Sequence, residues 1–281
     1  MNALEQVAFG WQCLLGAVRA CRRPRIWGPW LLLFALQAVG ILACWWSAHP
    51  LVSWFAAPLL RALEGDASLR YPELFRRLPG LARDAGLLTG VLVLPVMAGV
   101  SARLFERQFR GLPDGSAAAW SEGMSRAGAL LIAALPVSAA TLGLQAMLHA
   151  LPLVRLSGLA RSFAPPAADA ALLFVRIACA FAPALVVLGH RSGPRALAGL
   201  PATWGNGFLP AAVAMLLLVP AAGLASASVA AASTAIERGM PELVAAAVLL
   251  RAATGAILGM LASGAITLAW LGGVGAGTEE S

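Results

Sequence analysis

The stretch WGPWLLLFALQAVGILACWWSA, residues 27–48, contains no charged residue and decides the fold. A helix that spans the hydrocarbon core of a bilayer needs about 20 mostly apolar residues. Tryptophans stand at both ends of the stretch, and amphipathic aromatic side chains prefer the headgroup level of the membrane. The stretch therefore predicts a membrane-spanning helix.

Five further apolar runs follow, which predicts six spans in all. The runs are continuously apolar, whereas the strands of a membrane barrel alternate and are about ten residues long. Of the 281 residues, 60% are hydrophobic and only 12% are charged, against about 25% charged in ordinary soluble domains. We therefore predict an all-α, polytopic transmembrane helix bundle with spans at residues 27–48, 86–104, 127–154, 170–189, 208–231 and 243–272.

Residues 1–26 predict an amphipathic helix and a basic turn on the cytoplasmic face, followed by the transmembrane domain at 27–272. Within this segment, residues 2–19 carry apolar side chains at spacings of three and four, which favours a helix lying along the inner leaflet. The polar side is formed by Asn2, Glu5, Gln12 and Arg19. The apolar side is formed by Leu4, Val7, Ala8, Trp11, Leu14, Leu15 and Val18.

Two regions outside the spans complete the predicted domain organisation. Residues 49–85 form the longest outer loop, in which 51–63 are apolar enough for a re-entrant or interfacial helix and 69–85 would rest on the membrane surface. Residues 273–281 form a short C-terminal tail. Because the first long apolar run begins only near Trp27, we expect no cleavable signal peptide.

Arginine placement orients the chain. All 20 basic residues are arginines and the net charge is +7. Arg19, Arg22, Arg23 and Arg25 precede the first span, and a basic cluster there favours a cytoplasmic N-terminus. We predict a bacterial inner-membrane protein with both termini in the cytoplasm, whose arginines meet lipid headgroups rather than nucleic acid.

Prolines stand near the middle of the four central spans, at Pro95, Pro136, Pro183 and Pro220. Proline removes one backbone hydrogen bond and clashes with the preceding turn, so the helix bends. In lipid, the freed carbonyl needs another partner. The pattern predicts kinked central helices, which either surround a cavity and act as gates or are bent permanently.

Arg176 and Arg251 fall inside two of the predicted spans. Long basic side chains near a span end can reach the headgroup level. Alternatively, Arg155 and Arg161 join them in a site for an anion or a lipid phosphate. Asp169, seven residues before Arg176, is another possible partner for that arginine.

Gly255, Gly259 and Ser263 lie four residues apart in the last span. Small residues at this spacing let two helix backbones approach closely. The motif predicts helix packing, either within the molecule or against another subunit.

The sequence carries no recognised catalytic or cofactor motif. The three histidines lack a carboxylate cluster, and no cysteine pair has C-x-x-C spacing. A nucleophile elbow, a phosphate-binding loop and a dinucleotide fingerprint are also absent from the sequence. We therefore expect no enzyme, no catalytic residue, no cofactor and no bound metal. An intramembrane enzyme is the least favoured alternative.

Three segments share one plan, in which a Gly/Pro turn and a short amphipathic cytoplasmic helix are combined with a span. They are AFGWQCLLGAVRACRRPRIWGPWLLLF (8–34), GLPDGSAAAWSEGMSRAGALLIAALPV (111–137) and HRSGPRALAGLPATWGNGFLPAAVAMLLLVP (190–220). In this pattern most of the chain resembles the six-helix membrane domain attached to some bacterial glycerophosphodiester phosphodiesterases, and its free-standing inner-membrane relatives. The resemblance implies no catalytic residue here, because the catalytic domain of those proteins is separate.

The surface helix, basic turn and six spans also resemble the permease subunits of type-2 ABC exporters. Phe105-Glu106-Arg107 is similar to the charged cytoplasmic loop that those permeases present to their ATPase, although the rest of this loop is rich in Gly, Ala and Ser. We predict a non-enzymatic membrane protein that supports transport or envelope assembly together with other membrane subunits and membrane lipids. The alternative is a permease for a lipid or another amphiphile, with an ATPase subunit docked on residues 103–126.

Overall fold

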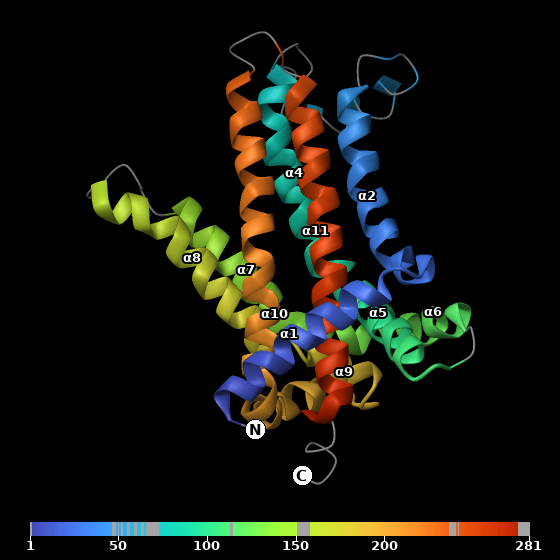
Figure 1. Ribbon diagram of the computed structural model, residues 1–281. Coiled ribbons are helices and arrows are strands. Elements are labelled where there is room, and N and C mark those ends of the chain that lie inside the picture. Colours follow the sequence, from blue (N-terminus) through green and yellow to red (C-terminus); the bar gives the residue numbers. More distant parts are fainter. Residues whose placement is uncertain are drawn as a thin grey trace. The chain divides into compact units, whose positions relative to one another are not determined.

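The computed structural model describes residues 2–46, 49, 51, 53–54, 57–58, 61–62, 65, 73–112, 115–150, 158–235, 240 and 242–274 (Figure 1). All regular structure in these residues is helical, as predicted. The chain divides into two compact units. Unit 1 comprises Met1–Trp27, Gly90–Leu217 and Leu261–Ser281, and unit 2 comprises Gly28–Thr89 and Leu218–Met260.

Unit 2 is a bundle of four helical segments that run side by side in Figure 1. The segments are α2 (Gly28–Trp45), most of α4 (Glu73–Leu92), the second part of α10 (Gly193–Ala235) and the first part of α11 (Glu242–Ala269). Their shared core is built from Ile41, Phe75, Leu78, Val229, Val244, Ala245, Ala247 and Val248.

One polar contact lies inside this bundle. The side-chain amide of Gln37 on α2 donates to the hydroxyl of Thr89 on α4 over 3.0 Å. The Thr89 hydroxyl in turn donates to the carbonyl of Ala85, also over 3.0 Å. Both polar side chains are therefore hydrogen-bonded, which removes much of the cost of burying them in an apolar bundle.

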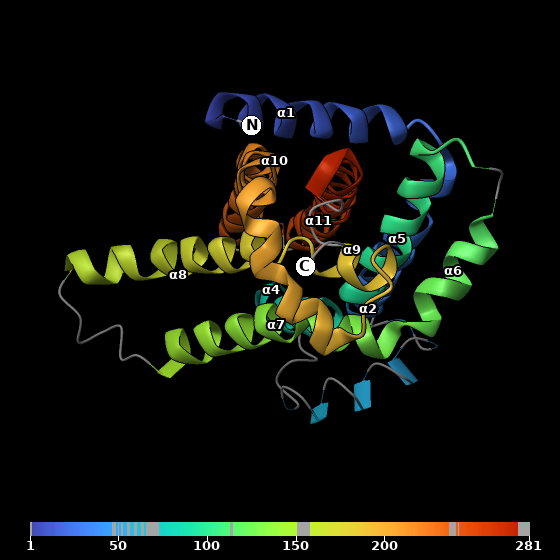
Figure 2. The same ribbon diagram turned by 90° about the horizontal axis from the view of Figure 1, so that it is seen from below.

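Unit 1 is built around a short buried helix, α9 (Ala182–Val187), which packs against α5 (Leu94–Phe109) and α7 (Ala127–Ala150). Leu185, Val186 and Val187 of α9 have no exposed surface. α8 (Gly158–Ala178) runs alongside α7, as Figures 1 and 2 show. The remaining elements of unit 1 are α1 (Ala3–Ala20), the 3-10 turn Pro24–Trp27, α6 (Ser116–Ser125), the first part of α10, the last part of α11 and the π-helical turn Trp270–Val274.

Among the described residues, five helical segments are long and apolar enough to cross a membrane, and counting the bent pair α4–α5 as one more span gives six. A contact within unit 1 fits the count of one span for this pair. Arg23, before α2, lines the same cavity as Arg107, at the end of α5. An even number of crossings therefore separates these two residues, as α2 and the α4–α5 pair would give.

The same argument, that two residues in contact are separated by an even number of crossings, applies to the other long helices. Arg126, before α7, contacts His190, after α9, as expected if α7 crosses and the α8–α9 segment returns. Gly10 of α1 lies against Pro210 of α10, and Phe9 of α1 lies against Gly272 at the end of the described chain. These contacts fit a third pair made of α10 and α11, and the described helices allow five or six spans in all.

The second and fourth predicted spans are not single straight helices. α4 begins at Glu73, so the part of 69–85 that the structure describes is helical and continues into the span instead of lying apart from it. α4 and α5 meet at Val93 with a bend of 55°. In the fourth span, a turn at residues 179–181 separates α8 from α9. Pro95 and Pro183 stand in the first turn of the helix after each break, where proline is well tolerated.

The other two central prolines do not interrupt their helices. α7 continues through Pro136, and α10 continues through Pro220 over a total of 43 residues. This length is about twice that of a minimal span, because the short cytoplasmic helix predicted before the fifth span and the span at 208–231 form one helix. The described residues of the predicted re-entrant segment 51–63 are Leu51, Ser53, Trp54, Ala57, Pro58, Arg61 and Ala62, and all of them are helical. The tail from residue 275 onward lies outside the described residues.

The predicted packing motif on α11 is used only in part. Gly259 lies directly against the indole of Trp30 on α2. A Cβ atom added at Gly255 would have no neighbour within 4 Å. The carbonyl of Ser263 accepts a hydrogen bond from Thr267. A close contact outside the predicted motif lies at Gly264 of the same helix, where an added Cβ would lie 2.6 Å from the ring of Phe105 and 2.8 Å from Cβ of Ala17.

We predict that Gly264→Ala destabilises the protein by about 1–3 kcal/mol, because the added methyl group overfills a closed contact. Gly255→Ala is the matched control and should leave stability unchanged or slightly raise it, since its Cβ meets open space. Unfolding in mixed detergent and SDS micelles measures both variants. Equal stability of the two variants would contradict the packing of α11 described above.

Candidate functional site

α1 begins with a reciprocal cap. The side chain of Asn2 accepts from the backbone N–H of Glu5 over 2.8 Å, and the Glu5 carboxylate accepts from the N–H of Asn2 over 2.9 Å. These two bonds satisfy donors that the first turn of a helix leaves open. The capping box fixes where α1 starts, and hence which side chains fall on each of its faces.

The buried face of α1 is composed mainly of small residues. Gly10, Cys13, Ala17 and Ala20 are buried there together with Gln6. A Cβ at Gly10 would lie 2.9 Å from the Cα of Pro210, so the backbones of α1 and α10 almost touch, and Figure 2 shows the two helices next to each other. Burial raises the pKa of the Cys13 thiol to about 11, which makes it a small apolar group rather than a reactive thiol.

The large apolar side chains of α1 are exposed. Their exposed fractions range from 37% for Leu15 to 82% for Leu4. We call these side chains the apolar ridge: Leu4, Val7, Trp11, Leu15 and Val18. Of the residues predicted on the apolar face, Leu14 is buried and the others are exposed. α1 thus has one face packed on protein, one exposed apolar face and one polar face. A helix that lies in a membrane interface has this arrangement.

A basic cavity of about 400 Å³ lies between the turn after α1 and the region where α5 leads into α6. Arg23 and Arg25 come from the turn, and Arg107 comes from the last turn of α5. No acidic side chain is among the lining residues that the structure describes. The described residues that line it are Arg23, Pro24, Arg25, Ile26, Leu104, Arg107, Gln108, Leu112, Gly115 and Ser116.

The walls of the basic cavity are held by specific contacts. The Gln108 side-chain amide donates to the carbonyl of Ala20 over 3.3 Å, which ties α5 to the end of α1. The indole N–H of Trp27 donates to the carbonyl of Cys21 over 2.8 Å. The guanidinium of Arg107 rests against Gly115, where an added Cβ would lie 2.7 Å from its Cζ. Glycine at 115 therefore leaves room for this arginine.

A buried ion network fixes α6 to α5 beside the cavity. The Nε and Nη2 atoms of Arg103 donate to the two carboxylate oxygens of Glu122 on α6 over 2.7 and 2.9 Å. Arg103 also donates to Glu106, whose residue is only 5% exposed. Arg110 approaches the same carboxylate at 3.4 Å. Such a two-pronged guanidinium–carboxylate pair adds geometric specificity as well as energy.

This network changes the interpretation of Phe105-Glu106-Arg107. Phe105 is completely buried, Glu106 is neutralised by Arg103 and Arg110, and Arg107 lines the basic cavity. The three side chains therefore serve contacts inside unit 1 rather than an exposed charged loop.

We predict that Arg103→Gln destabilises the protein by about 2–4 kcal/mol, because it leaves the buried Glu106 and the nearby Glu122 without their shared partner. Arg110→Gln is the control. Its side chain is 58% exposed, so its loss should cost no more than about 1 kcal/mol. Chemical unfolding in detergent provides the comparison, and a larger loss for Arg110→Gln than for Arg103→Gln would refute this assignment.

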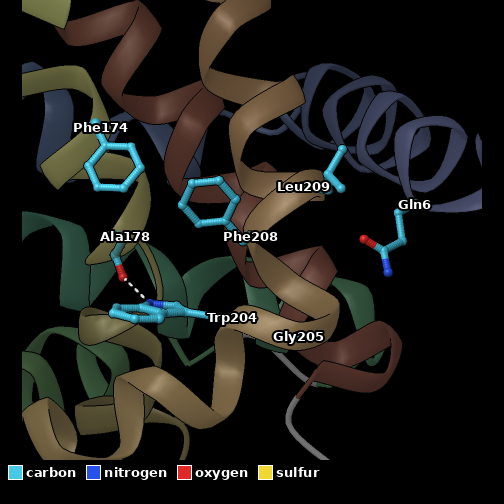
Figure 3. Close-up of a pocket in the computed structure, with 7 residues that line it drawn as sticks. All are labelled: Gln6, Phe174, Ala178, Trp204, Gly205, Phe208 and Leu209. Carbon is cyan, nitrogen blue, oxygen red and sulfur yellow. Dashed lines mark hydrogen bonds between the residues drawn. The ribbon is translucent and has the colours of Figure 1, made fainter. Parts of the chain in front are cut away.

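Side chains from other parts of the chain donate hydrogen bonds to backbone carbonyls at the break in the fourth span and at the end of α9. The indole N–H of Trp204 donates to the carbonyl of Ala178, the last residue of α8, over 2.9 Å (Figure 3). At the far end of α9, Nη1 of Arg126 donates to the carbonyl of Val186 over 2.6 Å. Its Nη2 lies 2.6 Å from Nδ1 of His190. Since a guanidinium only donates, Nδ1 is the unprotonated ring nitrogen.

An apolar crevice of about 270 Å³ lies beside Trp204. Figure 3 shows Phe174 of α8 facing Phe208 of α10, with ring centroids 5.8 Å apart. Gln6 of α1 brings an amide group to the other end of the crevice. Its remaining lining residues are Ala178, Trp204, Gly205 and Leu209. The crevice offers almost no polar group to a ligand, so we assign it no binding role.

The four central prolines line neither the basic cavity nor the apolar crevice. Pro95 and Pro183 begin helices in unit 1, Pro136 lies inside α7, and Pro220 belongs to unit 2. The kinks at the first two are part of the fold. Gating by any of the four stays a prediction.

The predicted arginine site is not assembled by the residues that the structure describes. Arg155 and the side chain of Arg161 lie outside those residues. Arg176 is exposed in unit 1, where Asp169 interacts with it electrostatically, and Arg251 is exposed in unit 2. Convergence of the four arginines therefore stays a prediction.

Sequence reasoning missed the basic cavity because its arginines are separated by about 80 positions, although the run Arg-Arg-Pro-Arg was visible.

No protein-family model, curated protein or solved structure matches the chain. Within the described part of the chain, no group of three or more His, Cys, Asp or Glu residues is placed to hold a metal ion. What the site does must therefore be inferred from its own geometry, above all from the basic cavity, the buried ion network and the exposed faces of the helices.

Proposed function

We propose that this multi-span membrane protein is a non-enzymatic subunit of a bacterial inner-membrane complex that supports transport or envelope assembly. The proposal depends mainly on one observation, which is the kind of residue exposed on the second part of α10.

That part of α10 exposes small residues along one side. Gly223, Ala227, Ala230 and Thr234 are exposed at spacings of four, three and four residues, which places them on one helical face. We call this set the small-residue face. A Cβ added at Gly223 would meet nothing within 4 Å. In membranes, small residues favour association because they let helix backbones approach closely.

The contrast with α2 supports this interpretation. α2 exposes Leu31, Leu32, Leu36 and Val39, which are the bulky side chains expected against lipid tails. The small-residue face of α10 gives lipid tails little to pack against, but it fits the surface of another helix. We therefore infer that a second membrane protein packs on α10.

The permease alternative is less favoured because of the way the charges of residues 103–126 are used. It needs residues 103–126 to present charge to an ATPase, whereas Arg103, Glu106 and Glu122 neutralise one another within unit 1. The exposed side chains of α6 include Ala117, Ala118, Ser121 and Met124, which carry no charge. This segment is thus better suited to stabilising the protein than to docking an ATPase.

We predict that Ala227→Leu reduces co-purification of partner membrane proteins at least several-fold, because it fills the small-residue face. Ala222→Leu, an exposed position about 120° away on the same helix, should leave co-purification unchanged. Purification from native membranes in mild detergent, followed by quantitative mass spectrometry, makes the comparison. Equal recovery of partners with both variants would contradict the proposal, and recovery of an ATPase subunit would favour the permease.

A further inference from the structure

We propose that the basic cavity binds the phosphate group of an anionic ligand, and that this ligand is an anionic phospholipid of the surrounding leaflet. The inference concerns a ligand site in unit 1 and is independent of whether α10 binds a partner. It depends on the charge of the cavity, on the rigidity of its walls and on its depth in the membrane.

The charge of the cavity favours an anion. Arg23, Arg25 and Arg107 all line it, and no carboxylate is among the lining residues that the structure describes. Glu106, next to Arg107 in the sequence, is paired with Arg103 and Arg110. Guanidinium groups match phosphate well, because their planar donor fork can hold two oxygens at once.

Hydrogen bonds and close packing hold the walls of the cavity in place. The Gln108–Ala20 hydrogen bond joins two of its walls, and the Trp27–Cys21 hydrogen bond holds the turn that carries Arg23 and Arg25. Gly115 leaves the space in which the Arg107 guanidinium lies. Little ordering is therefore needed on binding, which favours affinity.

Uncharged groups complete a site that suits a lipid headgroup. Ser116 lines the cavity and is the first residue of α6, a ten-residue helix, so the helix N-terminus adds partial positive charge. Leu104 and Leu112 supply an apolar wall for the glycerol and the upper part of an acyl chain. The volume of about 400 Å³ lies within the range of small-molecule sites.

The position of the cavity identifies the source of the phosphate. It lies at the C-terminal end of α1, and the apolar ridge of α1 is the face that enters the interface. A cavity that begins where this helix ends therefore lies near the depth of the lipid phosphates. Free phosphate and phosphate esters share the same chemistry, and competition distinguishes them from the lipid.

The test uses the full-length protein in phosphatidylcholine nanodiscs that contain a few per cent phosphatidylglycerol, with retained lipid measured by native mass spectrometry. Arg23→Gln combined with Arg25→Gln should reduce retained phosphatidylglycerol by roughly ten-fold or more, given the strength of charge-assisted hydrogen bonds. Arg19→Gln combined with Arg22→Gln is the matched control. It removes two exposed positive charges from the same region without touching the cavity, and it should change retention by less than about three-fold.

Three outcomes would overturn the proposal. Equal losses in the two double variants would show that the lipid responds only to overall charge. Retention of phosphatidylglycerol by the Arg23/Arg25 variant would show that the cavity is not the site. Displacement of the lipid by millimolar inorganic phosphate would show that a soluble phosphate compound is the ligand. Because all four altered side chains are exposed, folding of both variants is expected, and Arg107→Gln provides a second removal of charge from the cavity wall.

Discussion

A backbone carbonyl without a partner in hydrocarbon costs several kcal/mol, and this constraint explains where the helices of this protein end. α8 stops at Ala178, and the indole of Trp204 takes the free carbonyl. α9 ends near Val186, whose carbonyl is held by Arg126. At these two helix ends, a side chain from a distant part of the chain replaces the missing backbone donor. The end of α1 differs, because the carbonyl of Ala20 accepts from both the backbone N–H of Arg23 and the side chain of Gln108.

The regular part of the fold was predictable from the sequence, because it depends on local properties. The length and apolarity of runs such as 27–48 are sufficient to predict spanning helices, and the spacing of the apolar residues within 2–19 is sufficient to predict α1. Prolines indicated possible breaks, but not which ones would occur. Pro95 and Pro183 follow breaks whereas Pro136 and Pro220 do not, because the outcome depends on whether neighbouring groups can satisfy the backbone.

The candidate site was largely hidden from sequence reasoning, since it depends on tertiary contacts. Hydrophobic periodicity predicted an apolar face of α1 for the membrane, but it gave no sign that the buried face consists mainly of small residues around Gly10 and Ala17. Small residues carry little hydrophobic signal but allow the closest backbone contact. The basic cavity joins Arg23 and Arg25 to Arg107, and no local pattern relates positions so far apart.

The central claim is that α1 packs on the protein by its small residues and leaves its apolar ridge to the membrane. Spin labels on single-cysteine variants at Leu4, Trp11 and Val18, compared with Gln12 and Arg19 on the polar side, measure this directly once the native cysteines are replaced by serine. In lipid nanodiscs, the account predicts that the three ridge labels are accessible to oxygen and shielded from a water-soluble nickel complex, with the opposite pattern at Gln12 and Arg19. Ridge labels as accessible to the nickel complex as those on the polar side would contradict it.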